Sequence, residues 1–173
     1  RGRLGDIDKY NIKNTINVHF DTGKAELSPE DWQTTLNVNL MAPFWLTQAF
    51  LPELSKHHGS VLTISSIHER LTKPGFVAYA TSKSALSGMV RAMAVDLGGQ
   101  VRVNAISAGP IRTLASSAIG GILDMIHNVE EKAPLRRTVT QDEVGGTAAF
   151  LASPLSSGIT GQVIYVDAGY CIT

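Results

Sequence analysis

The sequence has few of the features that mark a specialised class of protein. Its 173 residues include one cysteine, Cys171, which excludes an internal disulfide and favours a reducing compartment. Basic and acidic side chains number 15 each, so no net charge attracts nucleic acid or an anionic membrane. No apolar run reaches the length that crosses a bilayer. We therefore expect a cytoplasmic protein with neither nucleic acid nor membrane as a partner.

Two kinds of binding motif are also missing. No two of the 16 glycines are separated by a single residue, so the Gly-x-Gly turn that brings a dinucleotide pyrophosphate to a helix N-terminus is absent. The five histidines show no metal-ligand spacing, and no metal site is predicted. His68 follows a predicted strand, where it would at most line a substrate cleft.

What is present is an alternation of short β-rich runs and amphipathic helices. Strands are predicted at 60–65, 101–106 and 162–166, and residues 15–20 are a further candidate for a strand or part of one. Helices are predicted at 28–54, 78–97, 114–128 and 141–151. Ser28 followed by Pro29 is typical of a helix start, because Ser caps the first turn and Pro fits its first position. The alternation predicts a parallel sheet with helical crossovers.

Three side chains in this pattern suggest catalysis. Tyr79 and Lys83 are four residues apart and share one face of a predicted helix, and Ser66 follows a predicted strand, thirteen residues before Tyr79. A nearby lysine charge favours the phenolate, so we expect Lys83 to lower the pKa of Tyr79. A phenol tuned in this way exchanges a proton with a carbonyl or alcohol oxygen, to which the Ser66 hydroxyl can also donate. Ser65 is a rival to Ser66, but the spacing favours Ser66.

These residues resemble the short-chain dehydrogenase/reductase family. The resemblance is carried, in family order, by Asn37-Val38-Asn39-Leu40, Thr63-Ile64-Ser65-Ser66, Tyr79-x-x-x-Lys83, Asn104–Pro110 and Thr160–Asp167. It implies an α/β fold, a three-layer Rossmann-like doubly wound parallel sheet, of which this chain would be the C-terminal portion. Because the glycine turn and an initiator Met are both missing, we expect residues 1–173 to form a single domain that is incomplete at its N-terminus.

The resemblance also implies a role for each matching residue. Tyr79 would be the general acid/base beside Ser66, with Lys83 bound to the nicotinamide ribose and Tyr79 close to the cofactor. Pro43 removes the helical partner of the Asn39 carbonyl, which in the family holds a water that relays protons from the lysine. The loop that would meet the cofactor consists of Gly109, Pro110, Ile111 and Thr113. The cofactor implied is NAD(H) or NADP(H), and the assembly a homodimer or homotetramer packed through helices 32–54 and 78–97.

The chain matches two branches of the family. Residues 28–97 resemble the carbonyl-reducing branch, whereas 102–145 resemble bacterial and plastid enoyl-acyl-carrier-protein reductases, whose tyrosine precedes the lysine by seven residues. That position here is Phe76, which has no hydroxyl. The expected function is therefore hydride transfer between a nicotinamide cofactor and a small carbonyl or secondary alcohol. Two alternatives stay open, reduction of an enoyl thioester in fatty acid synthesis and a catalytically silent chain.

Overall fold

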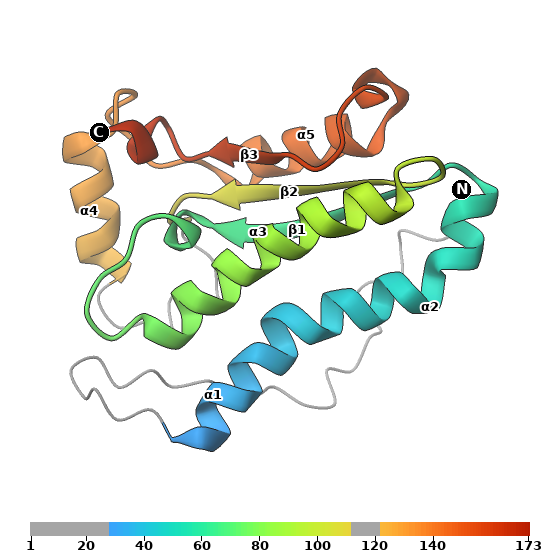
Figure 1. Ribbon diagram of the computed structural model, residues 1–173. Coiled ribbons are helices and arrows are strands. Elements are labelled where there is room, and N and C mark those ends of the chain that lie inside the picture. The colour runs from blue at the N-terminus through green and yellow to red at the C-terminus, as the bar shows by residue number, and fades with distance from the viewer. Residues whose placement is uncertain (1–27, 112–121) are drawn as a thin grey trace, which may run out of the picture.

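The computed structural model describes residues 28–111 and 122–173, and within these ranges a parallel sheet forms the centre. Its strands β1 (Ser60–Ser66), β2 (Arg102–Ala108) and β3 (Val163–Val166) are adjacent in that order. Each strand lies within two residues of its predicted bounds. The possible strand at 15–20 lies outside the described residues. As Figure 1 shows, α2 and α3 lie on one side of the sheet and α5 on the other, which is the expected three-layer arrangement.

The first helical region is continuous but contains a π-helical turn between two α-helical parts. It comprises α1 (Pro29–Leu36), a π-helical turn (Asn37–Met41) and α2 (Ala42–Lys56). The predicted cap is confirmed, because the Ser28 hydroxyl accepts a hydrogen bond from the Asp31 backbone N–H at 3.1 Å. Pro43 has no N–H to donate, and the π turn just before it bonds the Ala42 N–H to the Asn37 carbonyl instead.

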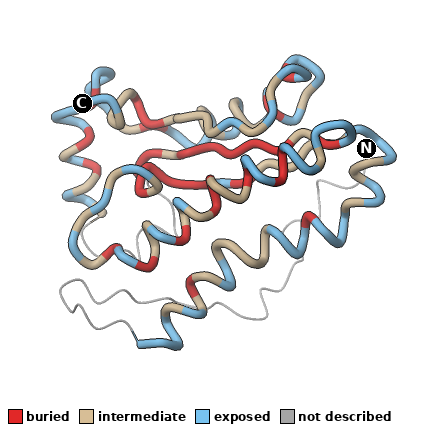
Figure 2. The backbone as a smooth tube through the Cα atoms, viewed as in Figure 1, coloured by how far each residue is buried: buried red, intermediate tan, exposed pale blue. Residues whose placement is uncertain are grey.

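Helix α3 (Val77–Leu97) covers the sheet and supplies most of its core on that side. Val90, Met93 and Ala94 pack with Val101 and Val103 around β2, with Met89 and Leu97 beside them. Figure 2 shows buried residues along β2, towards the end of β1 and on the sheet-facing side of α3, whereas β3 is intermediate and α2 is mostly exposed or intermediate. The apolar side of the helix predicted at 78–97, which was expected to pack against a second copy of the chain, is therefore part of the core. Exposed aromatics lie instead on α2, where Trp45 is 52% and Phe50 60% exposed, and on α5, which carries the exposed Phe150.

The remaining helices lie near the last strand. Helix α4 (Ile122–Lys132) stands at the carboxyl ends of the strands, and α5 (Gln141–Ala152) begins with a capping box between Thr140 and Glu143. Short 3₁₀ turns lie at Ile67–Glu69, Pro154–Ser156 and Tyr170–Ile172. Of the helix predicted at 114–128, only the part from Ile122 falls within the described residues. No helix in the described ranges is both long and apolar enough to cross a membrane.

Candidate active site

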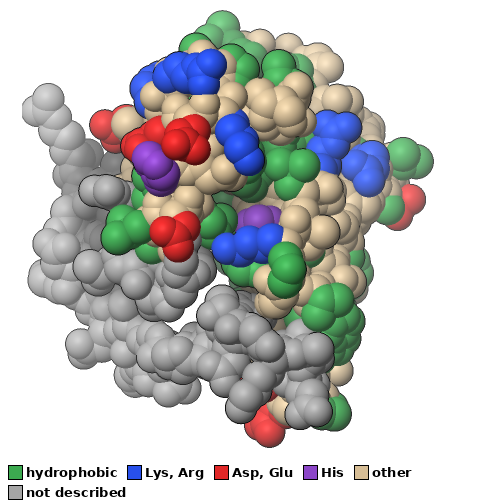
Figure 3. Space-filling view, turned by 90° about the vertical axis from the view of Figure 1, so that its left-hand side faces the viewer, with side chains coloured by type: hydrophobic (Ala, Val, Ile, Leu, Met, Phe, Trp, Pro, Cys, Tyr) green, Lys and Arg blue, Asp and Glu red, His purple; other side chains and the backbone are tan. Residues whose placement is uncertain are grey.

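The parallel register brings two of the predicted segments together. Ser66, the last residue of β1, pairs with Ala108, the last residue of β2, so Gly109 begins beside the candidate serine. Ligands of open parallel sheets bind outside the carboxyl ends of the strands. Figure 3 views the molecule from this end, where basic and acidic side chains are intermingled and neither sign dominates.

Ser66, rather than Ser65, meets the tyrosine. Ser66 and Tyr79 form a side-chain hydrogen bond, which favours the phenolate. The Ser66 oxygen also accepts a hydrogen bond from the His68 backbone N–H at 3.2 Å, which leaves the hydroxyl proton of Ser66 available for donation. Ser65 instead points into the interior, with its hydroxyl 3.4 Å from that of Ser87. Alternation of side chains along the strand separates the two serines.

The prediction that Lys83 lowers the pKa of Tyr79 is wrong for this arrangement. Burial of the phenol raises the pKa of Tyr79 above its ordinary value, and the bond with Ser66 offsets this in part. The Lys83 ammonium lies 5.6 Å from the centroid of the Tyr79 ring, and it donates to the Ile64 carbonyl at 2.9 Å. Tyr79 is consequently protonated at neutral pH, the form that a proton donor requires.

Lys83 itself is held in a partly apolar setting. Burial lowers the pKa of its ammonium, and the Ile64 carbonyl occupies one of its three hydrogen-bond donors. The side chain lines a cavity of about 370 Å³ between the π turn, α2 and β1. Asn39 lines the same cavity, together with Thr63. The two residues of the predicted proton relay, Lys83 and Asn39, therefore border one shared space.

Asn39 is joined to the tyrosine through a residue that the sequence reasoning missed. Its amide Nδ2 donates to the Ser82 hydroxyl at 3.1 Å, and Ser82 donates to the Tyr79 carbonyl at 2.7 Å. The fully buried Ser82 thus ties the π turn to the first turn of α3. The signal was present, since Ser82 lies three residues after Tyr79 and so on the same side of the helix.

The loop after β2 is pinned against the end of β3. A Cβ on Gly109 would lie 3.1 Å from the Asp167 Cα, so the close approach requires glycine. The Gly109 N–H donates to the Val166 carbonyl at 3.0 Å, and Pro110 is buried. The side chain of Ile111 packs on the cluster around Val129, Ala133, Val139 and Ala168. Thr113 lies outside the described residues.

These residues fit one half of a nicotinamide dinucleotide. The Lys83 ammonium has two further hydrogens, beyond the one that bonds the Ile64 carbonyl, that can donate to ribose hydroxyls. The Gly109–Ile111 backbone begins at the end of β2, beside Ser66. The phosphate half has no matching glycine turn in the sequence. Among the described residues, no group of three His, Cys, Asp or Glu side chains could hold a metal ion.

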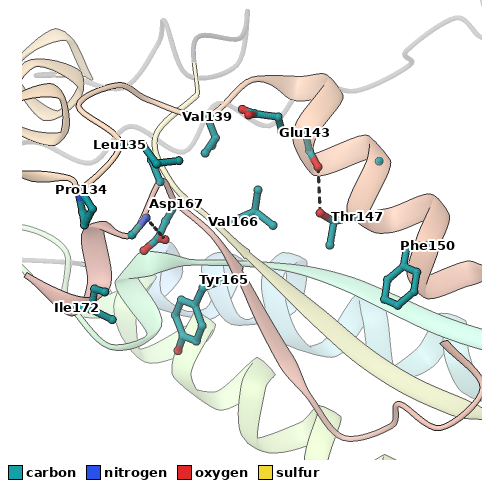
Figure 4. A pocket seen from close by; sticks show the side chains of 13 residues that line it. Pro134, Leu135, Val139, Glu143, Thr147, Phe150, Tyr165, Val166, Asp167 and Ile172 are labelled. Atoms are coloured by element: carbon teal, nitrogen blue, oxygen red, sulfur yellow. Dashed lines mark hydrogen bonds between the residues drawn. The ribbon is translucent and has the colours of Figure 1, made fainter. Parts of the chain in front are cut away.

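A second, larger cavity lies away from these residues. It measures about 760 Å³ and is bounded by α5 and β3, with Thr147 and Phe150 on one side and Tyr165 and Val166 on the other (Figure 4). None of Asn39, Ser66, Tyr79 and Lys83 lines it. The Asp167 carboxylate there accepts hydrogen bonds from the N–H groups of Gly169 and Cys171, at 3.0 and 2.8 Å, so it holds the turn that follows β3.

Known proteins match most of the chain. A family model described as "Enoyl-(Acyl carrier protein) reductase" matches residues 4–171. An NADH enoyl-[acyl-carrier-protein] reductase from Nostoc sp. is 54% identical over 84% of this chain and 57% of its own length, and one from Synechocystis sp. is 61% identical over 68% of this chain and 46% of its own. The chain thus spans about half the length of the curated relatives it matches.

Solved structures of two kinds share the fold. The enoyl-acyl carrier protein reductase of Bacillus cereus, in complex with NADP+ and indole naphthyridinone, superposes with a TM-score of 0.83 and 36% identity, over 91% of this chain and 62% of that one. A gluconate 5-dehydrogenase from Burkholderia cenocepacia, in complex with NADP and tartrate, superposes with a TM-score of 0.78 and 26% identity, over 85% and 58%.

Proposed function

This chain belongs to the enoyl-(acyl carrier protein) reductase family of short-chain dehydrogenases/reductases, and we propose that it acts as a nicotinamide-dependent oxidoreductase with Tyr79 as its proton donor. The observation that carries the proposal is the contact of Tyr79 with Ser66 at the carboxyl end of β1, with Lys83 next to the same ring. A bound reduced nicotinamide supplies the hydride. Either NADH or NADPH is the expected cofactor.

In the reductive direction each side chain has one task. Ser66, oriented by the His68 N–H, donates a hydrogen bond to the substrate oxygen. Tyr79 Oη gives its proton to that oxygen as negative charge develops there, and its raised pKa keeps the phenol in the acid form. Lys83 would hold the ribose, and Gly109–Ile111 would present backbone groups to the carboxamide. Asn39 and Lys83 would return a proton to Tyr79 through the cavity that they share.

An enoyl thioester of acyl carrier protein is the first candidate substrate, because the curated relatives carry that activity in their names. Hydride would add to the carbon β to the thioester, and the proton from Tyr79 would reach the enolate oxygen. Phe76 has no hydroxyl, so Tyr79, one turn further along α3, would have to serve that oxygen alone with Ser66.

A carbonyl or secondary alcohol is the second candidate, and the Ser66–Tyr79 contact specifically favours it. A ketone oxygen placed between these two hydroxyls receives a hydrogen bond from one and a proton from the other. The gluconate 5-dehydrogenase neighbour shows that the fold also serves an alcohol-oxidising enzyme. Phe76, 7% exposed, then acts only as an apolar wall.

The test compares two substrates of similar length with each cofactor. We expect the whole chain to oxidise NADH or NADPH when given crotonyl thioester or butanone, and the Tyr79→Phe variant to lose this activity. Turnover of the thioester alone would establish the first candidate, and turnover of butanone alone the second. No turnover with either substrate, together with no quenching of nicotinamide fluorescence at millimolar cofactor, would contradict the proposal and favour a catalytically silent chain.

We also propose that residues 1–173 fold as a single domain. A single cooperative transition, coincident by far-ultraviolet circular dichroism and by tryptophan fluorescence, is the expected result. Trp32 and Trp45 report on the α1–α2 region, whereas circular dichroism averages over the chain. Two separated transitions would show that the helical region unfolds independently of the sheet.

A further inference from the structure

His68 is placed against the catalytic side chains in two ways. It lies in the 3₁₀ turn that follows Ser66, and its backbone N–H bonds the Ser66 hydroxyl. Its ring centroid is 4.6 Å from that of Phe76 and 6.0 Å from that of Tyr79, with an edge-on approach to the tyrosine. The residue is 8% exposed, so this imidazole is part of the site wall rather than of the surface.

The hydrogen bonding of the ring defines its tautomer. Nδ1 lies 3.0 Å from the Leu71 carbonyl, and because a carbonyl only accepts, Nδ1 must carry the proton. In the neutral ring Nε2 then presents a lone pair. Burial, and to a lesser degree the charge of Lys73, lower the pKa of His68, which favours this neutral form.

The acceptor at Nε2 is unused. The atom is buried and has no hydrogen-bond partner among the described residues. Leaving a buried acceptor unpaired is costly, and such atoms in active sites often pair with a ligand. The imidazole ring lies next to the Phe76 and Tyr79 rings, and the His68 backbone N–H bonds the Ser66 hydroxyl that contacts Tyr79. The ring therefore adjoins the two hydroxyls that would hold a reacting oxygen.

We propose that His68 Nε2 accepts a hydrogen bond from a hydroxyl of the substrate, and that it selects small α-hydroxy ketones and the corresponding vicinal diols. The inference rests on the second candidate function above, carbonyl or alcohol redox. The reacting oxygen would occupy the Ser66–Tyr79 position, and a hydroxyl on the neighbouring carbon would reach the imidazole. An enoyl thioester has no such donor beside its double bond, so it would leave Nε2 unpaired.

Hydroxyacetone and butanone test this directly, since they differ by a hydroxyl in place of a methyl. We expect kcat/KM for hydroxyacetone to exceed that for butanone by roughly tenfold in the wild type, the gain typical of one neutral hydrogen bond. In His68→Phe the preference should vanish, so that the ratio of the two kcat/KM values falls to about one. His68→Asn is a second variant, because its amide can still donate to the Leu71 carbonyl while the acceptor at Nε2 is removed. Equal use of the two ketones by the wild type would overturn the proposal.

A binding measurement separates this inference from the proposed function. Nitrogen-15 NMR of labelled imidazoles should show the Nε2 signal, identified by its loss in His68→Phe, move on addition of hydroxyacetone but not of butanone. His57→Phe is the matched control, since that exposed ring belongs to the end of α2. If no substrate is turned over, the proposed function fails. The inference is then decided separately, by whether hydroxyacetone moves the Nε2 signal. Turnover of crotonyl thioester alone with an unmoved Nε2 signal would uphold the function and overturn the inference.

Discussion

The segment from β1 to α3 and the segment from β2 to the C-terminus treat their buried polar groups differently. In the first, Tyr79, Lys83 and His68 are partly or wholly buried with shifted pKa values, and the His68 Nε2 has no partner among the described residues. In the second, Asn104 and Asp167 are tied on both sides to backbone groups. The second segment also contains a buried hydroxyl without a partner among the described residues, that of Ser107, so a missing partner alone does not mark chemistry. What distinguishes the first segment is that its buried ionisable groups lie beside the contact of Ser66 with Tyr79.

The two segments also differ in what they resemble. The first segment carries the candidate catalytic residues Tyr79 and Ser66, whose hydroxyls suit a carbonyl oxygen. The family that matches residues 4–171 is described instead as an enoyl-(acyl carrier protein) reductase. The contrast shows that family membership and site geometry address separate questions. Four experiments can break or sharpen the contrast between the two segments.

Removal of the Tyr79 hydroxyl should have the largest effect. Tyr79→Phe keeps the ring packed against Phe76 and His68, so the fold should persist while turnover falls by about 10²–10⁴-fold, the usual contribution of a general acid. The measurement is the rate of nicotinamide oxidation at saturating substrate, with circular dichroism as the check on folding. Full turnover in this variant would remove the proposed acid.

Replacement of Asn104 should lower stability and leave turnover unchanged, the opposite of the Tyr79→Phe result. Its side chain donates to the Ile159 carbonyl at 2.9 Å and accepts from the Gln162 N–H at 3.0 Å, and it is 1% exposed. Asn104→Ala leaves both groups unpaired, which should lower the free energy of unfolding by about 2–3 kcal/mol, measured with urea. Turnover per folded molecule should not change. Gln100→Ala, at an exposed position, is the control.

Self-association should depend on α2, which directly precedes the first segment, and not on the second segment. Trp45 and Phe50 are exposed on α2, as expected of residues that a second copy of the chain would cover. Trp45→Lys should shift the sedimentation profile towards monomer, whereas Leu155→Lys, at an equally apolar and 83% exposed position in the second segment, should leave it unchanged. A wild-type chain that sediments as a monomer would contradict the expected homo-oligomer.

The smallest effect concerns Lys83 and pH. Its folded-state pKa lies below the ordinary value of 10.5, so the unfolded chain binds more protons between the two values. The stability contributed by this group is therefore present above pH 10.5 and is lost as pH falls through the lowered pKa. The free energy of unfolding of the wild type should rise relative to that of Lys83→Met between neutral pH and about pH 10. An unchanged difference would show that the ammonium is not desolvated.

Much of the fold could be predicted because its signals are local. The Ser28 cap, the alternating strands and the helices at Val77–Leu97 and Gln141–Ala152 follow from propensity and periodicity. The spacing of thirteen residues to Tyr79 also favoured Ser66 over Ser65. Only one of the two can contact Tyr79, because adjacent residues of a strand face opposite sides of the sheet. Two expectations were wrong because they depend on surroundings. The apolar side of α3 became core, and burial outweighed the lysine charge at Tyr79.

The sequence by itself determined the residue types and their spacing. These indicate the order of the strands and helices and the residues of the candidate site. The tertiary structure alone decided how those groups behave, because desolvation and hydrogen-bond satisfaction arise only when distant segments pack together. The pKa of Tyr79 is raised rather than lowered because packing buries its phenol. His68 offers a lone pair at the site because the Leu71 carbonyl takes its other nitrogen.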